Sequence, residues 1–399
     1  MSGRASRYIV IIGDGMADFA LGELGGRTPL QAARKPNIDC IAAGGWCGRV
    51  ATVPAGFPPG SDVACMSLFG YDPAKYYSGR APIEAYGMGR SLDDDDVAFR
   101  CNLVYLNVRP PKVLMGDYSA GHITTEEAGR LIADLNAEVG SETFRFFPGV
   151  GYRHLMVWKG GYADMETTPP HDISGKEVID HMPSGQGAKT IIRLMSDSQI
   201  FLKDHPVNAD RIARGLTPAN SIWLWGQGRR PAFPAFGDAY GTKGAVVAAV
   251  DLIKGIGSLA GFDTPRVAGA TGYLDTDYGA KARCVLSLIA DYDIVYVHVE
   301  APDEASHEGS LPEKIKAIER IDELVVGPIL EAAGEEIRLM VVTDHATPLS
   351  MKTHYACPVP FAVFQKGRKG PGGTYDEGNG GRLFSGEQMV GFFMKGLEP

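Results

Sequence analysis

The sequence lacks several features that would define whole classes of protein. It contains no run of about 20 apolar residues that could span a bilayer, no low-complexity segment and no CxxC pair. Residues 1–7 are short and polar and lead directly into a strand-like run, so we expect no signal peptide and a cytoplasmic protein. We also expect reduced thiols at the six cysteines, Cys40, Cys47, Cys65, Cys101, Cys284 and Cys357.

Basic residues are outnumbered, with 39 Lys and Arg against 48 Asp and Glu, which gives a formal net charge of -9. This balance argues against binding to nucleic acid or to an anionic membrane through bulk electrostatics. An anionic substrate must therefore be held by local Arg, Lys or metal. We expect a small phosphorylated molecule as the partner and leave a homo-oligomer open.

The length of 399 residues exceeds the size at which a single hydrophobic core stops growing, so two domains are expected. The hydrophobic fraction of 44% and the charged fraction of 22% are ordinary for a globular protein. The 51 glycines and 26 prolines indicate many tight turns.

Three apolar, β-branched runs predict buried parallel strands, at residues 8–12, 293–299 and 337–342. Each ends shortly before an acidic residue, namely Asp14, Asp303 and Asp344. Helical periodicity at residues 244–259 and 312–330 alternates with these strands, as a doubly wound α/β sheet requires. Ligands of such sheets gather at the carboxyl ends of the strands, so the three carboxylates are expected at one edge.

The pattern changes at about Asp93. Residues 97–104 and 151–159 predict strands, and residues 124–139 predict a helix that opens with a Thr-Thr-Glu-Glu capping sequence. We interpret residues 93–190 as a smaller α+β domain inserted into a discontinuous core domain, residues 1–92 and 191–399.

The acidic and imidazole groups predict a site for two cations. Asp303 and His307 lie four residues apart, so they share one face of a helix, and His354 from a separate loop could be a third ligand. Asp14, Asp344 and His345 could hold the second cation, in the two-metal arrangement that stabilises phosphoryl transfer. Each residue also has a simpler interpretation: Asp14 as a turn residue, His345 as a core histidine, the Asp-x-x-x-His spacing as chance. Imidazole with carboxylate suits Mn²⁺ or Zn²⁺ better than Mg²⁺, and Co²⁺ is a further candidate.

Ser61 follows Pro58-Pro59-Gly60 and precedes a helical pattern at residues 63–69. A hydroxyl at this place could be a metal-activated nucleophile beside a helix N-terminus that favours phosphate. It could equally be only the N-cap of that helix.

Over nearly its full length the sequence resembles the archaeal-type, cofactor-independent phosphoglycerate mutases of the alkaline phosphatase superfamily. The matching motifs include Ile12-Gly13-Asp14-Gly15, Pro59-Gly60-Ser61-Asp62, Gly79-Arg80-Ala81-Pro82, Phe99-Arg100-Cys101-Asn102, His171-Asp172-Ile173-Ser174, residues 303–309 and Thr343-Asp344-His345. The resemblance implies an alkaline-phosphatase-like core. It also implies one Mn²⁺-type ion on Asp303, His307 and His354, and another on Asp14, Ser61, Asp344 and His345.

The resemblance further implies that Ser61 takes the phosphoryl group from one hydroxyl of glycerate and returns it to the other, without bisphosphoglycerate, in glycolysis or gluconeogenesis. The inserted domain is expected to grip the substrate and close over it. Candidates for holding its carboxylate and phosphate are Arg80, Arg100, His122, Arg153, His171, Lys176 and Lys243. Each of them could instead be a solvated surface charge.

Other functions remain open. The segment around His122 is poorer in arginine than the family pattern, which leaves room for another small phosphorylated hydroxy acid or amino acid as substrate. A metal-dependent phosphatase or phosphonate hydrolase could use the same site, and a metal-binding regulator would leave Ser61 idle. A homoserine-kinase-like phosphotransferase would need a nucleoside triphosphate site, yet no GxxxxGK[ST] phosphate loop occurs.

Overall fold

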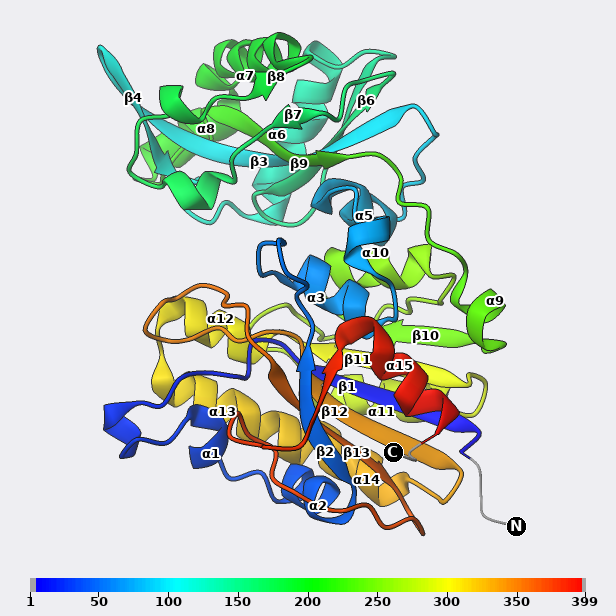
Figure 1. Ribbon diagram of the computed structural model, residues 1–399. Coiled ribbons are helices and arrows are strands. Elements are labelled where there is room, and N and C mark those ends of the chain that lie inside the picture. Colours follow the sequence, from blue (N-terminus) through cyan, green and yellow to red (C-terminus); the bar gives the residue numbers. More distant parts are fainter. Residues whose placement is uncertain (1–4, 397–399) are drawn as a thin grey trace. The chain divides into compact units, whose positions relative to one another are not determined.

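The computed structural model describes residues 5–396, so the polar start at Met1–Arg4 lies outside the described residues. The chain forms two compact units (Figure 1). Unit 1 comprises Met1–Tyr77 and Ala232–Pro399, and unit 2 comprises Ser78–Pro231.

Unit 1 is built on a mixed sheet whose strand order is β10-β11-β1-β12-β13-β2-β14. All neighbouring pairs are parallel except those of β13, which runs against both β12 and β2. The strands are β1 (Arg7–Gly13), β2 (Trp46–Ala51), β10 (Gly244–Val247), β11 (Ile294–Val299), β12 (Ile337–Thr343), β13 (Val359–Gln365) and β14 (Arg382–Ser385). The three predicted strands thus form the centre of the sheet, and the predicted α/β class is confirmed.

The register of the central strands aligns their carboxyl ends. Gly13, the last residue of β1, pairs with Val299 on β11 and with Thr343 on β12. The residues that directly follow these strand ends therefore lie at the same edge of the sheet. All three are acidic: Asp14, Glu300 and Asp344. Because the strands are buried apolar runs, their positions are fixed by the core and not by the acidic groups that follow.

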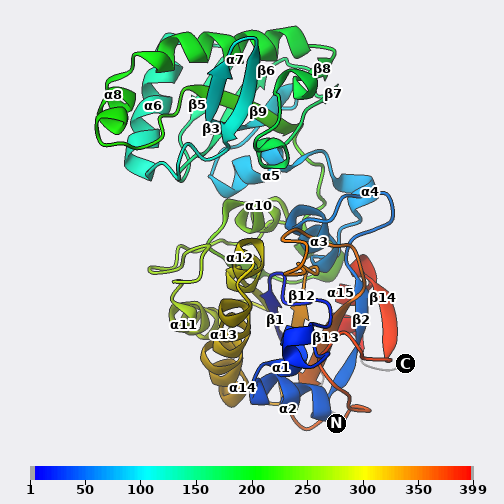
Figure 2. The same ribbon diagram turned by 90° about the vertical axis from the view of Figure 1, so that its left-hand side faces the viewer.

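Helices cover both faces of this sheet (Figures 1 and 2). One layer packs around α3 and contains α3 (Ser61–Leu68), α10 (Asp251–Leu259) and α15 (Gly386–Lys395). The other contains α2 (Pro36–Gly44), α11 (Tyr278–Leu288), α13 (Leu311–Ile321), the π-helical turn η4 (Asp322–Val326) and α14 (Gly327–Ala332). The shorter helices are α1 (Pro29–Ala32), α4 (Pro73–Tyr76), α9 (Phe236–Tyr240), α12 (Ala301–Glu308) and η1 (Gly22–Leu24).

The predicted helix at residues 244–259 is wrong in its first part. Residues 244–247 form strand β10, which pairs in parallel with β11, and the helix begins only at Asp251. Gly244-Ala245-Val246-Val247 is an apolar run too short for periodicity to separate strand from helix. These residues form a strand because they pair with β11, whose backbone would otherwise have no partner on that side of the sheet.

Unit 2 is an antiparallel sheet with helices. The long strand β3 pairs with β6 and β9 through its first half and with β4 through its second. The strands of this sheet are β3 (Asp96–Arg109), β4 (Lys112–Asp117), β5 (Phe144–Phe147), β6 (Arg153–Lys159) and β9 (Ser221–Gly228). The short strands β7 (Met165–Glu166) and β8 (Ser184–Gly185) form a separate two-stranded sheet. The helices of unit 2 are α5 (Arg80–Gly87), α6 (Thr125–Glu138), η2 (Pro170–Ile173), η3 (Ile179–His181), α7 (Ala188–Lys203) and α8 (Pro206–Ala213).

The predicted insertion, residues 93–190, lies inside unit 2, and the unit extends beyond it on both sides. β9 belongs to unit 2 because it pairs with β3, and α5 packs against both of these strands. The core of the unit joins these late segments to the early ones through buried side chains such as Phe99, Leu131, Ile191 and Trp223. Within residues 5–396, no helix has the length and apolar character needed to cross a bilayer.

Candidate metal centre

The ends of β1 and β12 bring Asp14, Asp344 and His345 together in a buried cluster. His345 Nε2 lies 3.4 Å from Asp14 Oδ1 and 3.4 Å from Asp344 Oδ2. Asp344 is held by its other oxygen, Oδ1, which accepts hydrogen bonds from the backbone N–H groups of Gly15 at 3.1 Å and His345 at 2.8 Å. Asp344 Oδ2 therefore points to the same place as His345 Nε2.

A second group of ligands adjoins the first. Asp303 and His307 lie one turn apart on α12, with 3.1 Å between Asp303 Oδ2 and His307 Nε2. His354 Nε2 lies 3.6 Å from Asp303 Oδ1 and 3.2 Å from His307 Nε2. The rings of His345 and His354 are 4.3 Å apart, so the two predicted ligand sets form one continuous cluster.

Ser61 is the first residue of α3, and Gly60 is the N-cap. The Ser61 hydroxyl makes no capping bond; its Oγ lies 3.1 Å from His345 Nε2. The simple interpretation of Ser61 as the helix cap is therefore wrong, because the helix starts one residue earlier than that role requires. The Ser61 hydroxyl thus contacts an imidazole of the ligand cluster.

The charges of the cluster fit divalent cations. Burial raises the pKa of Asp14 well above its ordinary value, and the carboxylates of Asp344, Asp303 and Glu300 raise it further. Asp14 Oδ1 is buried and accepts no hydrogen bond from the described residues. Buried carboxylates that repel one another and present free lone pairs are stabilised by a bound cation, and carboxylate with imidazole is a donor set for Mn²⁺ or Zn²⁺.

The histidines of the cluster differ in charge. Burial lowers the pKa of His345 to about 4, so this ring is neutral and can offer a lone pair. At His307 burial acts in the same direction, but the hydrogen bond and charge of Asp303 outweigh it and raise its pKa to about 9. Burial alone would raise the pKa of Asp303. Its hydrogen bonds with His307 and His354 outweigh this effect and hold the pKa well below the ordinary value.

Three buried groups behind Asp14 were not predicted from the sequence. His298 on β11 has Nε2 3.5 Å from Asp14 Oδ2 and Nδ1 3.2 Å from Glu300 Oε1. Glu300 Oε2 in turn accepts a 2.8 Å hydrogen bond from Lys281 Nζ on α11. The sequence held a signal for two of them: His298 lies inside an apolar strand, and Glu300 directly follows that strand. Lys281 carries no signal in the sequence.

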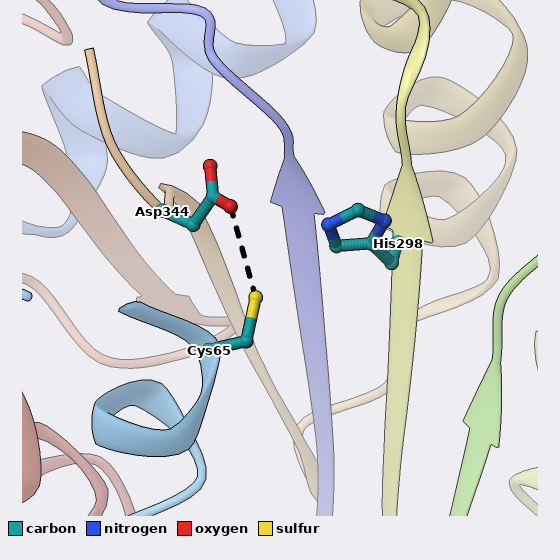
Figure 3. Close-up of side chains that lie close together, drawn as sticks. All are labelled: Cys65, His298 and Asp344. Carbon is teal, nitrogen blue, oxygen red and sulfur yellow. Dashed lines mark hydrogen bonds between the residues drawn. The ribbon is translucent and has the colours of Figure 1, made fainter. Parts of the chain in front are cut away.

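Cys65 on α3 was also overlooked as part of this site. Figure 3 shows its sulfur facing Asp344, with His298 on β11, on the far side of β1; Cys65 Sγ is 3.7 Å from Asp344 Oδ2. Burial raises the pKa of the Cys65 thiol well above its ordinary value, and Asp344 and Asp14 add to this effect. Cys65 is therefore a protonated thiol that donates to Asp344.

Two of the predicted substrate-binding arginines meet in unit 2 at one carboxylate. Glu84 Oε1 accepts a 2.8 Å hydrogen bond from Arg80 Nε, and Glu84 Oε2 lies 2.9 Å from Arg100 Nε. Burial opposes ionisation of Glu84, but the guanidinium groups of Arg100 and Arg80 outweigh it and lower its pKa. The Arg100 guanidinium also stacks over Trp225, 4.4 Å from the ring centroid.

Three more candidates lie near aromatic rings of unit 2. His171 packs edge-on to Trp225 at 5.4 Å and to Tyr118 at 6.1 Å. Arg153 lies over the ring of Tyr152 at 5.5 Å, and His122 lies 6.4 Å from the same ring. Contacts through Glu84, Trp225, Tyr118 and Tyr152 join these candidates into one network of arginine, histidine and aromatic side chains, in which Arg100 is buried. The members of this network are Arg80, Arg100, Arg153, His122 and His171.

The other two candidates behave differently. Lys176 is exposed, and its Nζ donates a 2.9 Å hydrogen bond to the backbone carbonyl of Asp172. Lys243 precedes β10 and lies over the ring of Tyr292, at the amino end of β11. The ligand cluster lies at the carboxyl end of the same parallel strands, so the structure does not bring Lys243 to this cluster.

We expect Gly15→Ala to weaken Mn²⁺ binding without removing any ligand. Gly15 has φ +60°, and a Cβ there would lie 2.6 Å from Asp303 Oδ1 and 2.6 Å from Thr347 Oγ1. Displacement of these groups should lower the affinity by about 10- to 100-fold in isothermal titration calorimetry. Gly25→Ala is the matched control, since Gly25 has φ +65° with open space around it. Equal affinities for the two variants would contradict the crowding argument.

We expect Glu84→Gln to destabilise the protein by about 3–5 kcal/mol, because it leaves buried Arg100 without its counter-charge. The free energy of unfolding can be followed in urea by tryptophan fluorescence, since three of the four tryptophans, Trp158, Trp223 and Trp225, lie in unit 2. The control is Asp197→Asn, which breaks the exposed pair with Arg193 and should cost at most about 0.5 kcal/mol. Similar small losses in both variants would contradict the expectation.

Comparison with known proteins agrees with the geometry. A sequence profile for 2,3-bisphosphoglycerate-independent phosphoglycerate mutase matches residues 42–208. The chain is 52% identical to a probable 2,3-bisphosphoglycerate-independent phosphoglycerate mutase of Geobacter sulfurreducens, over 90% of both chains. It is also 52% identical to the mutase of Methanosarcina acetivorans, over 93% of this chain and 94% of the relative.

Solved structures agree as well. The PH0037 protein from Pyrococcus horikoshii is similar with a TM-score of 0.82 and 30% identity, over 98% of this chain and 97% of the other. The cofactor-independent phosphoglycerate mutase from Thermoplasma acidophilum matches with a TM-score of 0.65 and 26% identity, over 98% and 99% of the two chains. The chain belongs to the family of 2,3-bisphosphoglycerate-independent phosphoglycerate mutases, which are isomerases.

Proposed function

We propose that this chain interconverts 3-phosphoglycerate and 2-phosphoglycerate through a phosphoserine at Ser61. In the first half-reaction a bond forms between Ser61 Oγ and phosphorus, and the bond from phosphorus to one glycerate oxygen breaks. That oxygen takes up a proton in place of the one lost from Ser61. After the glycerate has turned within the site, its other hydroxyl takes the phosphoryl group and Ser61 regains a proton.

The observation that carries this proposal is the position of the Ser61 hydroxyl. Its Oγ lies 3.1 Å from His345 Nε2, beside the carboxylates that surround this ring. Ser61 also begins α3, a helix of eight residues whose first N–H groups favour an anion. A nucleophile at this place can approach a phosphoryl group that the helix end helps to hold.

We propose that the ligand residues hold two divalent cations, with Mn²⁺ as the expected ion. Asp303, His307 and His354 would hold one, and Asp14, Ser61, Asp344 and His345 the other. Such ions supply neutralisation of the phosphoryl oxygens and a lower pKa for a serine hydroxyl. Asp14, Asp303 and Asp344 bring the negative charge that retains the cations in a buried site.

We propose that the network of arginine, histidine and aromatic side chains in unit 2 binds the carboxylate and phosphate of the substrate. Arg100 and Arg80 are oriented by Glu84, and the guanidinium of Arg100 is further fixed by Trp225. Guanidinium groups held in this way lose little freedom when they bind an anion in a bidentate manner. Arg153, His122 and His171 lie at nearby aromatic rings and could contact the rest of the glycerate.

We expect Ser61→Ala to lower mutase activity by more than about 1,000-fold, because the phosphoryl acceptor is lost. The assay couples 2-phosphoglycerate formation from 3-phosphoglycerate, with Mn²⁺ and without added 2,3-bisphosphoglycerate. Ser67→Ala is the control: Ser67 is buried in the same helix and its Oγ makes no hydrogen bond to the described residues. An active Ser61→Ala protein would refute the phosphoserine route.

We expect exhaustive chelation to abolish activity and Mn²⁺ to restore it, since the buried carboxylates need cations to organise the site. Full activity after chelation, verified by elemental analysis, would argue against the two-metal site. If the restored enzyme released inorganic phosphate rapidly and formed no 2-phosphoglycerate, the chain would be a hydrolase on the same site instead.

A further inference from the structure

Thr347 lies between the two proposed ligand sets, although nothing in the sequence marks it as functional. It is fully buried, three residues beyond Asp344. Its hydroxyl oxygen lies 2.6 Å from Asp303 Oδ1 and 3.1 Å from His345 Nδ1. Asp303 belongs to one ligand set and His345 to the other.

The directions of these two hydrogen bonds follow from the groups involved. A carboxylate can only accept, so the single hydroxyl hydrogen of Thr347 is donated to Asp303 Oδ1. The hydroxyl oxygen can then only accept from His345, which requires the ring hydrogen on Nδ1. His345 Nε2 is left with a free lone pair, and this is the atom that faces Asp14, Asp344 and Ser61.

We propose that Thr347 is a positioning residue that fixes His345 and Asp303 for cation binding and so couples the two metal sites. This inference rests on the proposed function, because it takes both residues as ligands. The hydroxyl sets the ring tautomer and orientation of one ligand and the carboxylate orientation of the other. Ligand orientation by such neighbouring hydrogen bonds is a general way in which proteins tune metal affinity.

The backbone around Thr347 is held as firmly as the side chain. Its N–H donates to the carbonyl of Ala17 at 3.1 Å, and its own carbonyl accepts a 2.9 Å hydrogen bond from Lys314 Nζ. Lys314 is fully buried and pairs with Asp18 Oδ2 at 2.8 Å. The same Asp18 oxygen accepts from the N–H of Leu349 at 3.1 Å. Hydrogen bonds therefore fix the backbone at Thr347 and at Leu349. A fixed backbone restricts the positions that the Thr347 hydroxyl can take.

The test compares Mn²⁺ binding to the full chain in Thr347→Val, Thr347→Ser and Ser306→Ala proteins by isothermal titration calorimetry. Val keeps the shape and removes the hydroxyl, whereas Ser keeps the hydroxyl and removes the methyl group. Ser306 is the control, a buried hydroxyl on α12 that only donates to the carbonyl of Pro302 at 2.7 Å.

We expect two ions per chain in the wild type, a loss of affinity of about 10- to 100-fold for both ions in Thr347→Val, and near wild-type affinity in Thr347→Ser and Ser306→Ala. If the Val protein does not fold, Thr347→Ala against Thr347→Ser gives the same contrast.

Wild-type affinity in Thr347→Val would overturn the inference about Thr347 alone, as would equal weakening in the Ser or Ser306→Ala proteins. A wild-type chain that binds no Mn²⁺ would overturn the proposed function as well.

Discussion

The main constraint on this structure is that its buried sheet brings several carboxylates close together at one edge. Gly13, Val299 and Thr343 end three adjacent strands in register, so Asp14, Glu300 and Asp344 follow at nearly the same level. Grouping buried carboxylates is unfavourable, because each ionised carboxylate raises the free energy of ionising its neighbours. The apolar core of β1, β11 and β12 supplies the stabilisation that holds them there.

The charges are balanced by two different means. Behind the cluster, Lys281 neutralises Glu300, and His298 stands between Glu300 and Asp14. At the front, Asp14 Oδ1, Asp344 Oδ2 and the free lone pair of His345 converge. The Cys65 thiol donates to Asp344 Oδ2, and Asp14 Oδ1 accepts no hydrogen bond from the described residues. At the back, Lys281 offsets the charge of Glu300, but the ring nitrogens of His298 and Glu300 Oε1 make no hydrogen bond to the described residues. The front presents the lone pairs that a cation would bind. Thr347 and Cys65 contribute only hydrogen bonds that aim these atoms.

Much of this arrangement could be predicted from the sequence, because apolar strands ending at acidic residues reveal the sheet and its functional edge together. Asp14, Asp303 and Asp344 were predicted in this way, whereas His307, His345, His354 and Ser61 were predicted from neighbouring motifs and from the family resemblance. The structure brings all seven residues into one cluster. Thr347 and Lys281 could not be found, since their roles arise from tertiary contacts that no local pattern encodes. Lys243 precedes strand β10, which pairs in parallel with β11, so it lies at the end of the strands opposite to the ligand cluster. The outer limits of unit 2 were missed because β9 joins β3 across more than a hundred residues.

The account requires two cations within reach of one serine hydroxyl. Anomalous diffraction at the manganese edge from crystals of the full chain grown with Mn²⁺ measures this directly. We expect two peaks, one among Asp303, His307 and His354, and one among Asp14, Asp344, His345 and Ser61. A single peak, or peaks away from these side chains, would contradict the account.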